Sequence, residues 1–567
     1  MSGDALVYDM AQSSRKDPSV FIKKDWLSIL DEQNGNYSGN QCVINTSQIA
    51  NSNRYMDMRQ GYLTVPLLLT LTNNTPAVGN FAPATSATSA DYALGLKNWI
   101  GTVVNSLTLN LNGTTIIQQS NMLPIWNNFK LLTTLSWNDT AMFPSMGFYP
   151  DSSLSFSFQT GASEQGIGSA NNCNALAFPT VTGAFNSYLT GNEGMTRRQM
   201  YWNYDPQAPT GTATNTANFS TMLSSTYANQ IYKSYIFTKQ DSTATLHAVY
   251  QQAITGVIYL RHLSDFFDRM PLLKGIFMTM TLGISNVSVD FTVGAGNVIS
   301  GATVTNSLGG VNPLLISSAL AGNGANSLPA DGYKASLSVG AKCLNTSQQS
   351  ITGVVNSPLQ QSVTLQVPSY VFTPQLEIAY LSQPVKRIYY EDIYQFVVQN
   401  VASGTSFNSL ISNGISNMKK VLIAPFFTAS ANGGIHQLQS PFSTAGGGTT
   451  AELAMVGSAN IVISGANLWL NTVKYSYEMW QNAVYGINSI NHGLTDGVSS
   501  SLLSQQDWEN SYCYMVGDVE RMLDVEKDVP KSLSIVGQNL SGKEVDYQVF
   551  VSYGVEIVID ALTGARV

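Results

Sequence analysis

Histidine is the first residue type to examine for chemistry, because it supplies general acids, general bases and metal ligands near neutral pH. The chain of 567 residues contains four of them, at His247, His262, His436 and His492. None stands in a metal-binding spacing such as HxxxH, so zinc is unsupported. Ser264 and Asp265 follow His262, but neighbours on one short helix cannot form a serine–histidine–aspartate relay in that order. We predict that His262 is a surface histidine with its hydrogen bonds satisfied.

Cysteines offer no better start for a catalytic or metal site. The four, Cys42, Cys173, Cys343 and Cys513, are far apart in the sequence. Disulfide frameworks and zinc sites need closer or patterned spacing such as CxxC. We therefore predict four reduced, buried thiols.

Two glycine-containing segments look like nucleotide-binding loops. Residues 537–543 (GQNLSGK) match a phosphate-binding loop up to its last position, where Glu544 replaces the Ser or Thr that would bind Mg²⁺. The segment that follows, VDYQVFV, has the pattern of a strand, whereas that loop must open a helix. We predict a β-hairpin loop at 537–543, and a flexible loop at Gly446–Gly448, which lacks a dinucleotide-binding fingerprint.

The carboxylates and aromatic residues favour structural roles. Glu391 and Asp392 are adjacent in a predicted strand, so their side chains point to opposite faces and cannot share a cleft. A glycoside hydrolase would need two carboxylates about 5–10 Å apart in a groove, and no convincing pair is found. Core or subunit-interface positions are the commoner explanation for a set of aromatic residues that could also stack on glycans: Tyr389, Tyr390, Tyr394, Phe396, Tyr475, Tyr477 and Trp480. We predict no catalytic, cofactor-binding or metal-binding residues, no enzyme activity and no small-molecule substrate.

The composition is unusually poor in charge. Only 11% of the residues are charged, against roughly a quarter in an ordinary soluble protein. Amides and hydroxyls supply the polarity, and weak like-charge repulsion suits a surface that packs against other copies. The net charge of −8 argues against a dedicated nucleic-acid binder, which needs clustered Lys and Arg.

One basic segment stands out near the N-terminus. Arg15, Lys16, Lys23 and Lys24 surround a single acidic residue, Asp17. This segment is either a short flexible arm or an arm that faces a genome or lipid headgroups. The first residues have no apolar core of signal-peptide length, and no run approaches 18 apolar residues. We expect synthesis in a reducing cell interior, without secretion by a signal peptide and without a membrane span.

The periodicity predicts a protein built mainly of strands. Residues 62–72 read as a strand that Pro66 confines to an edge or a bend. Alternating leucines before Asn112-Gly113 predict a hairpin, and residues 122–137 predict a helix. Further predicted elements are a short helix at 261–270, strands at 278–282, 335–339, 362–367, 421–427 and 545–560, and helices at 406–418 and 503–523.

The order of these elements repeats loosely in the two halves of the chain. We predict an N-terminal arm at 1–40 and a first β-domain at 41–300, with a long loop insertion at about 138–245. A second β-domain is predicted at 301–567, preceded by a loop-rich connector at about 301–360. The fold class is therefore all-β, with two tandem domains.

Several segments resemble the double jelly-roll major capsid proteins of polinton-like viruses and virophages. They are residues 31–67, 100–116 with the helix that follows, 259–286, 390–427 and 468–488. Single motifs in this family are degenerate, but their order and spacing cover most of the chain outside the loops.

The resemblance implies two tandem eight-stranded antiparallel jelly-roll sandwiches with short helices in loops. Three chains would form a homotrimeric, pseudo-hexameric capsomer, and these capsomers would tile an icosahedral capsid around a DNA genome in the virion. Implied partners are other copies of the chain, penton proteins and minor capsid proteins. Outer towers would come from loops 138–245 and 428–456, and the arm with Arg15, Lys16, Lys23 and Lys24 would make weak contact with the genome or an inner membrane. The alternative is a β-sandwich adhesin or spike that binds glycans.

Overall fold

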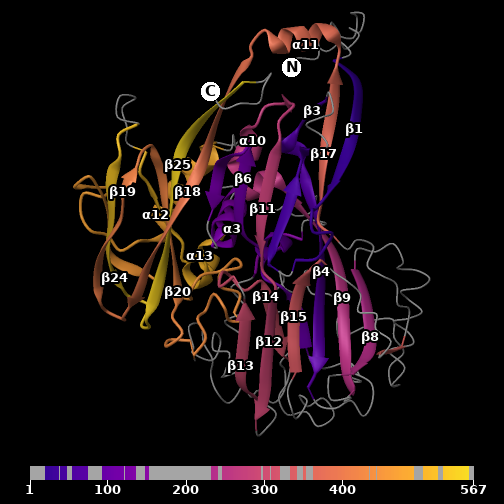
Figure 1. Cartoon of the computed structure of the whole chain (residues 1–567). Coiled ribbons are helices and arrows are strands. Elements are labelled where there is room, and N and C mark those ends of the chain that lie inside the picture. Colours follow the sequence, from indigo (N-terminus) through magenta and orange to yellow (C-terminus); the bar gives the residue numbers. More distant parts are fainter. Residues whose placement is uncertain are drawn as a thin grey trace, which may run out of the picture.

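The computed structural model describes residues 20–37, 39–47, 54–74, 92–119, 122–135, 147–151, 232–240, 246–294, 298–306, 308–318, 333–340, 349–352, 362–432, 434–441, 443–490, 502–520 and 528–560. Strands dominate these residues, and helices are short (Figure 1). The predicted tower loop at 138–245 lies largely outside the described residues, apart from residues 147–151 and one strand, β8 (Tyr232–Gln240).

The first half of the chain forms a sandwich of two antiparallel sheets. One sheet has the order β1 (Phe21–Leu30), β17 (Thr364–Phe372), β4 (Tyr62–Asn73), β9 (Leu246–Tyr259). The other has the order β2 (Gln41–Asn45), β11 (Met278–Ile284), β6 (Val104–Leu111), β7 (Thr114–Gln119). Counted along the chain, these eight strands stand in the orders 1-8-3-6 and 2-7-4-5, which is the jelly-roll topology.

The second half repeats this strand order. One sheet is β18 (Val385–Val401), β25 (Val545–Asp560), β20 (Met418–Phe427), β23 (Met515–Asp518). The other is β19 (Ser406–Ile415), β24 (Lys531–Asn539), β21 (Val456–Ile463), β22 (Ala466–Asn467). The orders are again 1-8-3-6 and 2-7-4-5. The predicted fold of two tandem eight-stranded jelly-roll sandwiches is confirmed.

The pairing of the strands suggests domain limits that differ from the predicted ones. The last strand of the first sandwich, β17, ends at Phe372, and the second sandwich begins at Val385. Helix α11 (Pro374–Leu381) connects the two sandwiches at the top of Figure 1. We therefore propose the domain boundary at α11 in place of 300/301, because residues 301–372 include strands that pair with β1, β4 and β12 (Val287–Gly294). Likewise, residues 21–30 of the predicted arm form β1.

Additional short strands extend the first sandwich. They are β3 (Tyr55–Met56), β5 (Tyr92–Leu96), β8, β10 (Leu273–Lys274), β12, β13 (Val298–Asn306), β14 (Leu314–Ser318), β15 (Tyr333–Val339) and β16 (Gln349–Thr352). Strand β15 pairs with β4 beyond the point where β17 stops pairing with it. In the described part of the chain, these strands make the first sandwich larger than the second.

Pro66 lies in the middle of its sheet, so of the two predicted alternatives, an edge or a bend, the edge is wrong. Strand β4 has β9 along one side. On its other side, the pairing with β17 ends at Thr64 and the pairing with β15 begins at Leu67. Pro66 falls where the neighbour changes, so its missing N–H removes no ladder hydrogen bond on that side.

Several local predictions are confirmed. Asn112 (φ 48°) and Gly113 (φ 82°) both lie in the left-handed region, as a tight hairpin between β6 and β7 requires. The predicted helix at 122–137 is α3 (Leu123–Thr134), and the short one is α9 (Leu260–Leu263) with α10 (Asp265–Arg269). No helix in the described ranges has the length and hydropathy needed to cross a membrane.

One predicted helix is wrong, and another is predicted too long. Residues 406–415 form β19, whose pairing with β24 has bulges between Leu410 and Ser412 and between Ser412 and Ile415. The extra residues put the buried Ile411 and Ile415 four positions apart, which imitates a helical spacing. The helix predicted at 503–523 is shorter, at α13 (Gln505–Ser511), and β23 follows it.

Candidate functional site

The two sandwiches meet around α3, which lies between them in Figure 1. Its aromatic side chains pack on the second sandwich: the Phe129 ring lies 6.0 Å from that of Trp480 and 5.5 Å from that of Tyr514. Trp126 lies 6.2 Å from Phe550 in the same way. The buried apolar side chains of both sandwiches form one continuous cluster. The sandwiches are therefore joined by a shared core.

A fully buried lysine crosses the same interface. Lys97 follows β5 of the first sandwich, and its Nζ donates hydrogen bonds to the backbone carbonyls of Ser440 (2.8 Å) and Ala445 (3.1 Å) in the second. Burial lowers the pKa of Lys97 to about 7, and Asp151 opposes this shift. We call Lys97 with these carbonyls and Gly447 the Lys97 socket.

The glycine triplet forms one wall of this socket, so the prediction of a flexible loop is wrong. A Cβ on Gly447 would lie 2.1 Å from Cβ of Lys97. The Gly447 carbonyl accepts a hydrogen bond from Asn128, and the Gly448 carbonyl accepts one from Tyr514 at 2.7 Å. Only glycine allows this approach of backbone to side chain.

The segment around this triplet is equally unlike the outer tower expected for residues 428–456. Its buried polar residues are Thr428, Asn432, Gln437, Ser440, Ser443, Thr444, Thr449, Thr450 and Glu452. Because much of this segment packs against the first sandwich and its neighbouring loops, its polar groups are paired inside the protein. The tower prediction for 428–456 is therefore wrong.

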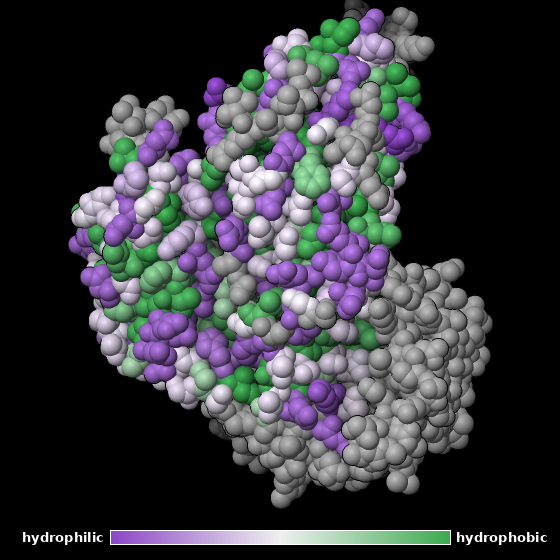
Figure 2. Space-filling view, in the orientation of Figure 1, coloured by the Kyte–Doolittle hydropathy of each residue, from purple (hydrophilic) through white to green (hydrophobic). Residues whose placement is uncertain are grey.

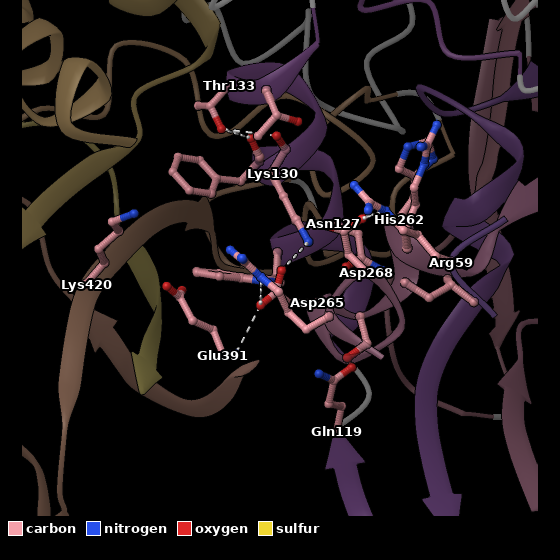
Figure 3. A pocket seen from close by; sticks show the side chains of 17 residues that line it. Arg59, Gln119, Asn127, Lys130, Thr133, His262, Asp265, Asp268, Glu391 and Lys420 are labelled. Carbon is pink, nitrogen blue, oxygen red and sulfur yellow. Dashed lines mark hydrogen bonds and ion pairs between the residues drawn. The ribbon is translucent and has the colours of Figure 1, made fainter. Parts of the chain in front are cut away.

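A cleft of about 390 Å³ opens beside α3 (Figure 3). Its walls come from α3, α9 and α10 of the first sandwich and from β18 and β20 of the second. Lining residues with charged side chains are Arg59, Lys130, Arg261, Asp265, Asp268, Arg269, Glu391 and Lys420. We refer to this site as the cleft.

Ion pairs hold two of the three carboxylates of the cleft. Asp268 accepts from Arg59 at 3.2 Å. Asp265 lies 4.0 Å from Lys130 and 3.8 Å from Arg269, and it accepts the backbone N–H of Glu391 at 3.2 Å. Asp265 thus links α3 and α10 to the edge strand β18 of the second sandwich.

The side chains of Glu391 and Asp392 point to opposite faces of β18, as predicted for adjacent residues of a strand. Glu391 lines the cleft, whereas Asp392 is buried on the other face of β18. Asp392 accepts hydrogen bonds from Gln119 (3.2 Å) and Tyr553 (3.3 Å), and burial raises its pKa. The two side chains do not share a site.

Two of the four histidines have described surroundings. His436 Nε2 lies 3.2 Å from Asp546, and its Nδ1 accepts the N–H of Leu438. His262 is partly buried, and its Nδ1 has no partner among the described residues, so the prediction of a satisfied surface histidine is wrong. His492 lies outside the described residues.

The remaining predicted positions are structural. Cys42 and Cys513 are buried and unpaired, as predicted, while Cys173 and Cys343 lie outside the described residues. The loop at 537–543 joins β24 of one sheet to β25 of the other, so it is an inter-sheet connection and the hairpin prediction is wrong. No group of three or more potential metal ligands occurs in the described ranges.

The structure describes two of the four basic residues of the predicted arm. Lys23 and Lys24 lie on β1, where Lys23 pairs with Asp25 at 2.9 Å and Lys24 lies over the Tyr370 ring at 5.3 Å. Arg15 and Lys16 lie outside the described residues. The arm lysines in the described range therefore already have partners in the same chain.

Three large apolar side chains of β1 are exposed. Ile22, Trp26 and Leu30 stand four positions apart, with exposed fractions of 65%, 51% and 57%, and the polar residues Lys24 and Ser28 lie between them. The Trp26 ring lies 5.6 Å from Tyr62, which lies 5.8 Å from Tyr259. We call these five apolar and aromatic residues the β1 face. Sequence reasoning missed it, although the four-residue spacing of Ile22, Trp26 and Leu30 carries the signal.

Exposed apolar residues also occur on the second sandwich. Leu410 on β19 is 53% exposed and Leu540, after β24, is 44% exposed. Figure 2 shows hydrophobic residues gathered over β19 and β24, among hydrophilic ones. Both sandwiches thus present apolar surface to their surroundings.

Of the known proteins compared with this chain, only solved structures are similar to it, and the similarity extends over nearly the whole chain. No protein-family model matches the sequence, and no curated protein matches it. A chain from the Sputnik virophage has 12% identity, with 98% of this chain and 90% of that chain covered and a TM-score of 0.48. The mavirus major capsid protein has 9% identity, coverages of 99% and 92% and a TM-score of 0.46. The Faustovirus major capsid protein has 9% identity, coverages of 96% and 92% and a TM-score of 0.41.

Proposed function

We propose that this chain is the major capsid subunit of an icosahedral DNA virus, located in the virion. The observation that carries this proposal is the pair of complete jelly-roll sandwiches with the same strand order in one chain. A shared core and the Lys97 socket fix one sandwich to the other. Such a rigid two-block unit suits a tile, because three copies related by a threefold axis supply six similar blocks, a pseudo-hexamer.

The β1 face supports contact with further copies. An edge strand with large exposed apolar side chains invites pairing or aggregation unless another surface covers it. We propose that a neighbouring chain in a homotrimer covers Ile22, Trp26 and Leu30. Obligate interfaces of this kind bury on the order of 2,000–5,000 Å². Penton and minor capsid proteins would complete the shell.

Contact with a genome or inner membrane would be weak. Since Lys23 and Lys24 already have intramolecular partners, this contact would depend on Arg15 and Lys16. The net charge of −8 likewise disfavours tight binding to phosphate backbones.

A structural role fits the cleft better than catalysis does. Lys130 and Arg269 neutralise Asp265, and Arg59 neutralises Asp268. Carboxylates paired in this way are engaged by cations of the same chain, whereas a general acid or base must be placed to exchange a proton with a substrate. We therefore propose that the chain is not an enzyme.

One observation favours a second candidate function, glycan binding. Trp26, Tyr62 and Tyr259 form a row of aromatic rings across the first sandwich. Aromatic faces of this kind can stack on sugars, as an adhesin or spike would require. Covering of the same row by a sister chain is the capsid alternative.

The mass of the purified chain in solution tests the capsid proposal. We expect a particle of three times the chain mass by analytical ultracentrifugation, and hexagonal plates by negative-stain microscopy. A strict monomer at micromolar concentration would overturn the proposal. Saturable binding of that monomer to a glycan array would favour the adhesin.

Two variants locate the subunit contact. Trp26→Asp should convert the trimer to monomers, because it places a charge in the proposed interface. Leu470→Asp, at a position 92% exposed on the second sandwich, is the matched control and should remain trimeric. Trimers in both variants would retain the capsid proposal but reject the β1 face as the contact.

A further inference from the structure

The cleft contains more positive charge than its carboxylates neutralise. Five cationic side chains and three carboxylates line it. Within the described part of the chain, Arg261 and Lys420 have no carboxylate at ion-pair distance, and Arg261 lies over the Tyr259 ring at 5.3 Å. In a chain of net charge −8, such a local excess of cations needs an explanation.

Three carboxylates cancel part of this excess at Lys420. Glu391 in the cleft, together with Asp518 and Glu520 nearby, interacts electrostatically with Lys420 and counteracts the lowering of its pKa by burial. The backbone N–H of Glu391 donates to Asp265. Even with these carboxylates counted against Lys420, Arg261 on the wall formed by α9 has no carboxylate at ion-pair distance among the described residues.

Two buried polar atoms at the cleft have no partner among the described residues. Nδ2 of Asn127, a residue only 1% exposed, makes no hydrogen bond, and neither does Nδ1 of His262. Both residues line the cleft and lie near each other in Figure 3. An unsatisfied buried donor is costly, so a ligand atom that accepts from it would be stabilised.

The surroundings of His262 show the sign of the local potential. Burial lowers the pKa of His262 to about 3, and the positive charges of Arg261 and Lys130 add to this shift. The ring is therefore neutral at pH 7, and one of its nitrogens carries a hydrogen that can be donated. Positive potential with free donors attracts anions and repels metal cations.

We propose that the cleft binds a small molecule bearing phosphate groups, held by Arg261 and Lys420 and oriented by Asn127 and His262. Phosphate fits better than carboxylate, because its three or four oxygens can accept from donors on several walls at once. A ligand long enough to reach both walls would contact α3 and α9 of the first sandwich and β20 of the second, which lie on opposite sides of the cleft in Figure 3. Binding would therefore strengthen the junction between the two sandwiches.

Calorimetric titration of the intact chain with inorganic pyrophosphate, in a buffer free of phosphate, tests this proposal. We expect one saturable site per chain. Arg261→Gln and Lys420→Gln act on opposite walls, and each should weaken binding by about tenfold or more, since each removes a charge-assisted hydrogen bond. Circular dichroism and thermal unfolding without ligand should show that both variants are folded.

Control measurements separate a built site from general attraction. Arg387→Gln removes an exposed arginine on β18 outside the cleft and should leave the affinity unchanged within about twofold. Absence of saturable binding up to about 1 mM, or an equal loss in Arg387→Gln, would overturn the proposal. Citrate binding as tightly as pyrophosphate would overturn the assignment to phosphate. None of these outcomes bears on the trimer mass that tests the capsid proposal.

Discussion

The Lys97 socket and the cleft lie at the same junction between the sandwiches, yet their cationic side chains differ in burial and in the groups that bind them. In the socket, a fully buried ammonium is satisfied by two backbone carbonyls. In the cleft, partly exposed cations pair with carboxylates, and Arg59 is 63% exposed in its side chain. Burial, more than the number of charges, therefore decides which cations hold the sandwiches together, because water screens exposed pairs strongly.

The sharpest test of this difference is Lys97→Ala. The variant leaves two buried carbonyls without a donor and a cavity where the side chain lay. Relief from burying a cation offsets part of this loss. We expect the free energy of unfolding in urea to fall by about 2–4 kcal/mol. Lys334→Ala, on the exposed side of β15, should change it by about 0.5 kcal/mol or less; equal losses would contradict the special role of burial.

The pH dependence of stability tests the same socket. The pKa of Lys97 is lowered from 10.5 to about 7 in the folded chain, so between these values the unfolded chain binds the proton more readily. Stability contributed by this group must then rise with pH from about 7 to 10.5 and stay flat below 7. Urea unfolding of the wild type and Lys97→Met across this range should show their difference growing in favour of the wild type. A constant difference would show that Lys97 titrates normally.

Gly447→Ala is expected to have the next largest effect. The added Cβ would overlap Cβ of Lys97, and neither backbone nor Cβ can move as a flexible side-chain end could. We expect a loss of about 1–3 kcal/mol in thermal or urea unfolding. Gly414→Ala, on β19 with nothing within 4 Å of the new Cβ, is the control and should not destabilise. Tolerance of both changes would mean that the socket is loosely packed.

Much of the fold was predictable because its signals are local. The Asn112-Gly113 turn and the strand β25 are signalled by neighbouring residues in the sequence, and the structure has both. The failures come from long-range pairing. Pro66 looks like an edge residue until β17 and β15 are seen to share one side of β4, and the bulges of β19 imitate a helix.

The candidate sites were less predictable for the same reason. Nothing near Lys97 in the sequence indicates that its partners are Ser440 and Ala445, more than 340 positions away. Gly446–Gly448 reads as a flexible loop because glycine permits both freedom and close packing. Likewise, the cleft unites α9 with β20, which only the packing of the two sandwiches brings together.

The smallest effect is expected in the cleft, from Arg59→Gln. This change breaks the ion pair with Asp268, but both side chains are partly exposed, at 63% and 34%, so water replaces the lost partner. We expect the free energy of unfolding to fall by about 0.2–1 kcal/mol at low salt and by less in 1 M NaCl, where screening is stronger. Urea unfolding at both salt concentrations measures this. A loss as large as that of Lys97→Ala would mean that the cleft is closed to water in the folded chain, and the contrast between the two regions would then fail.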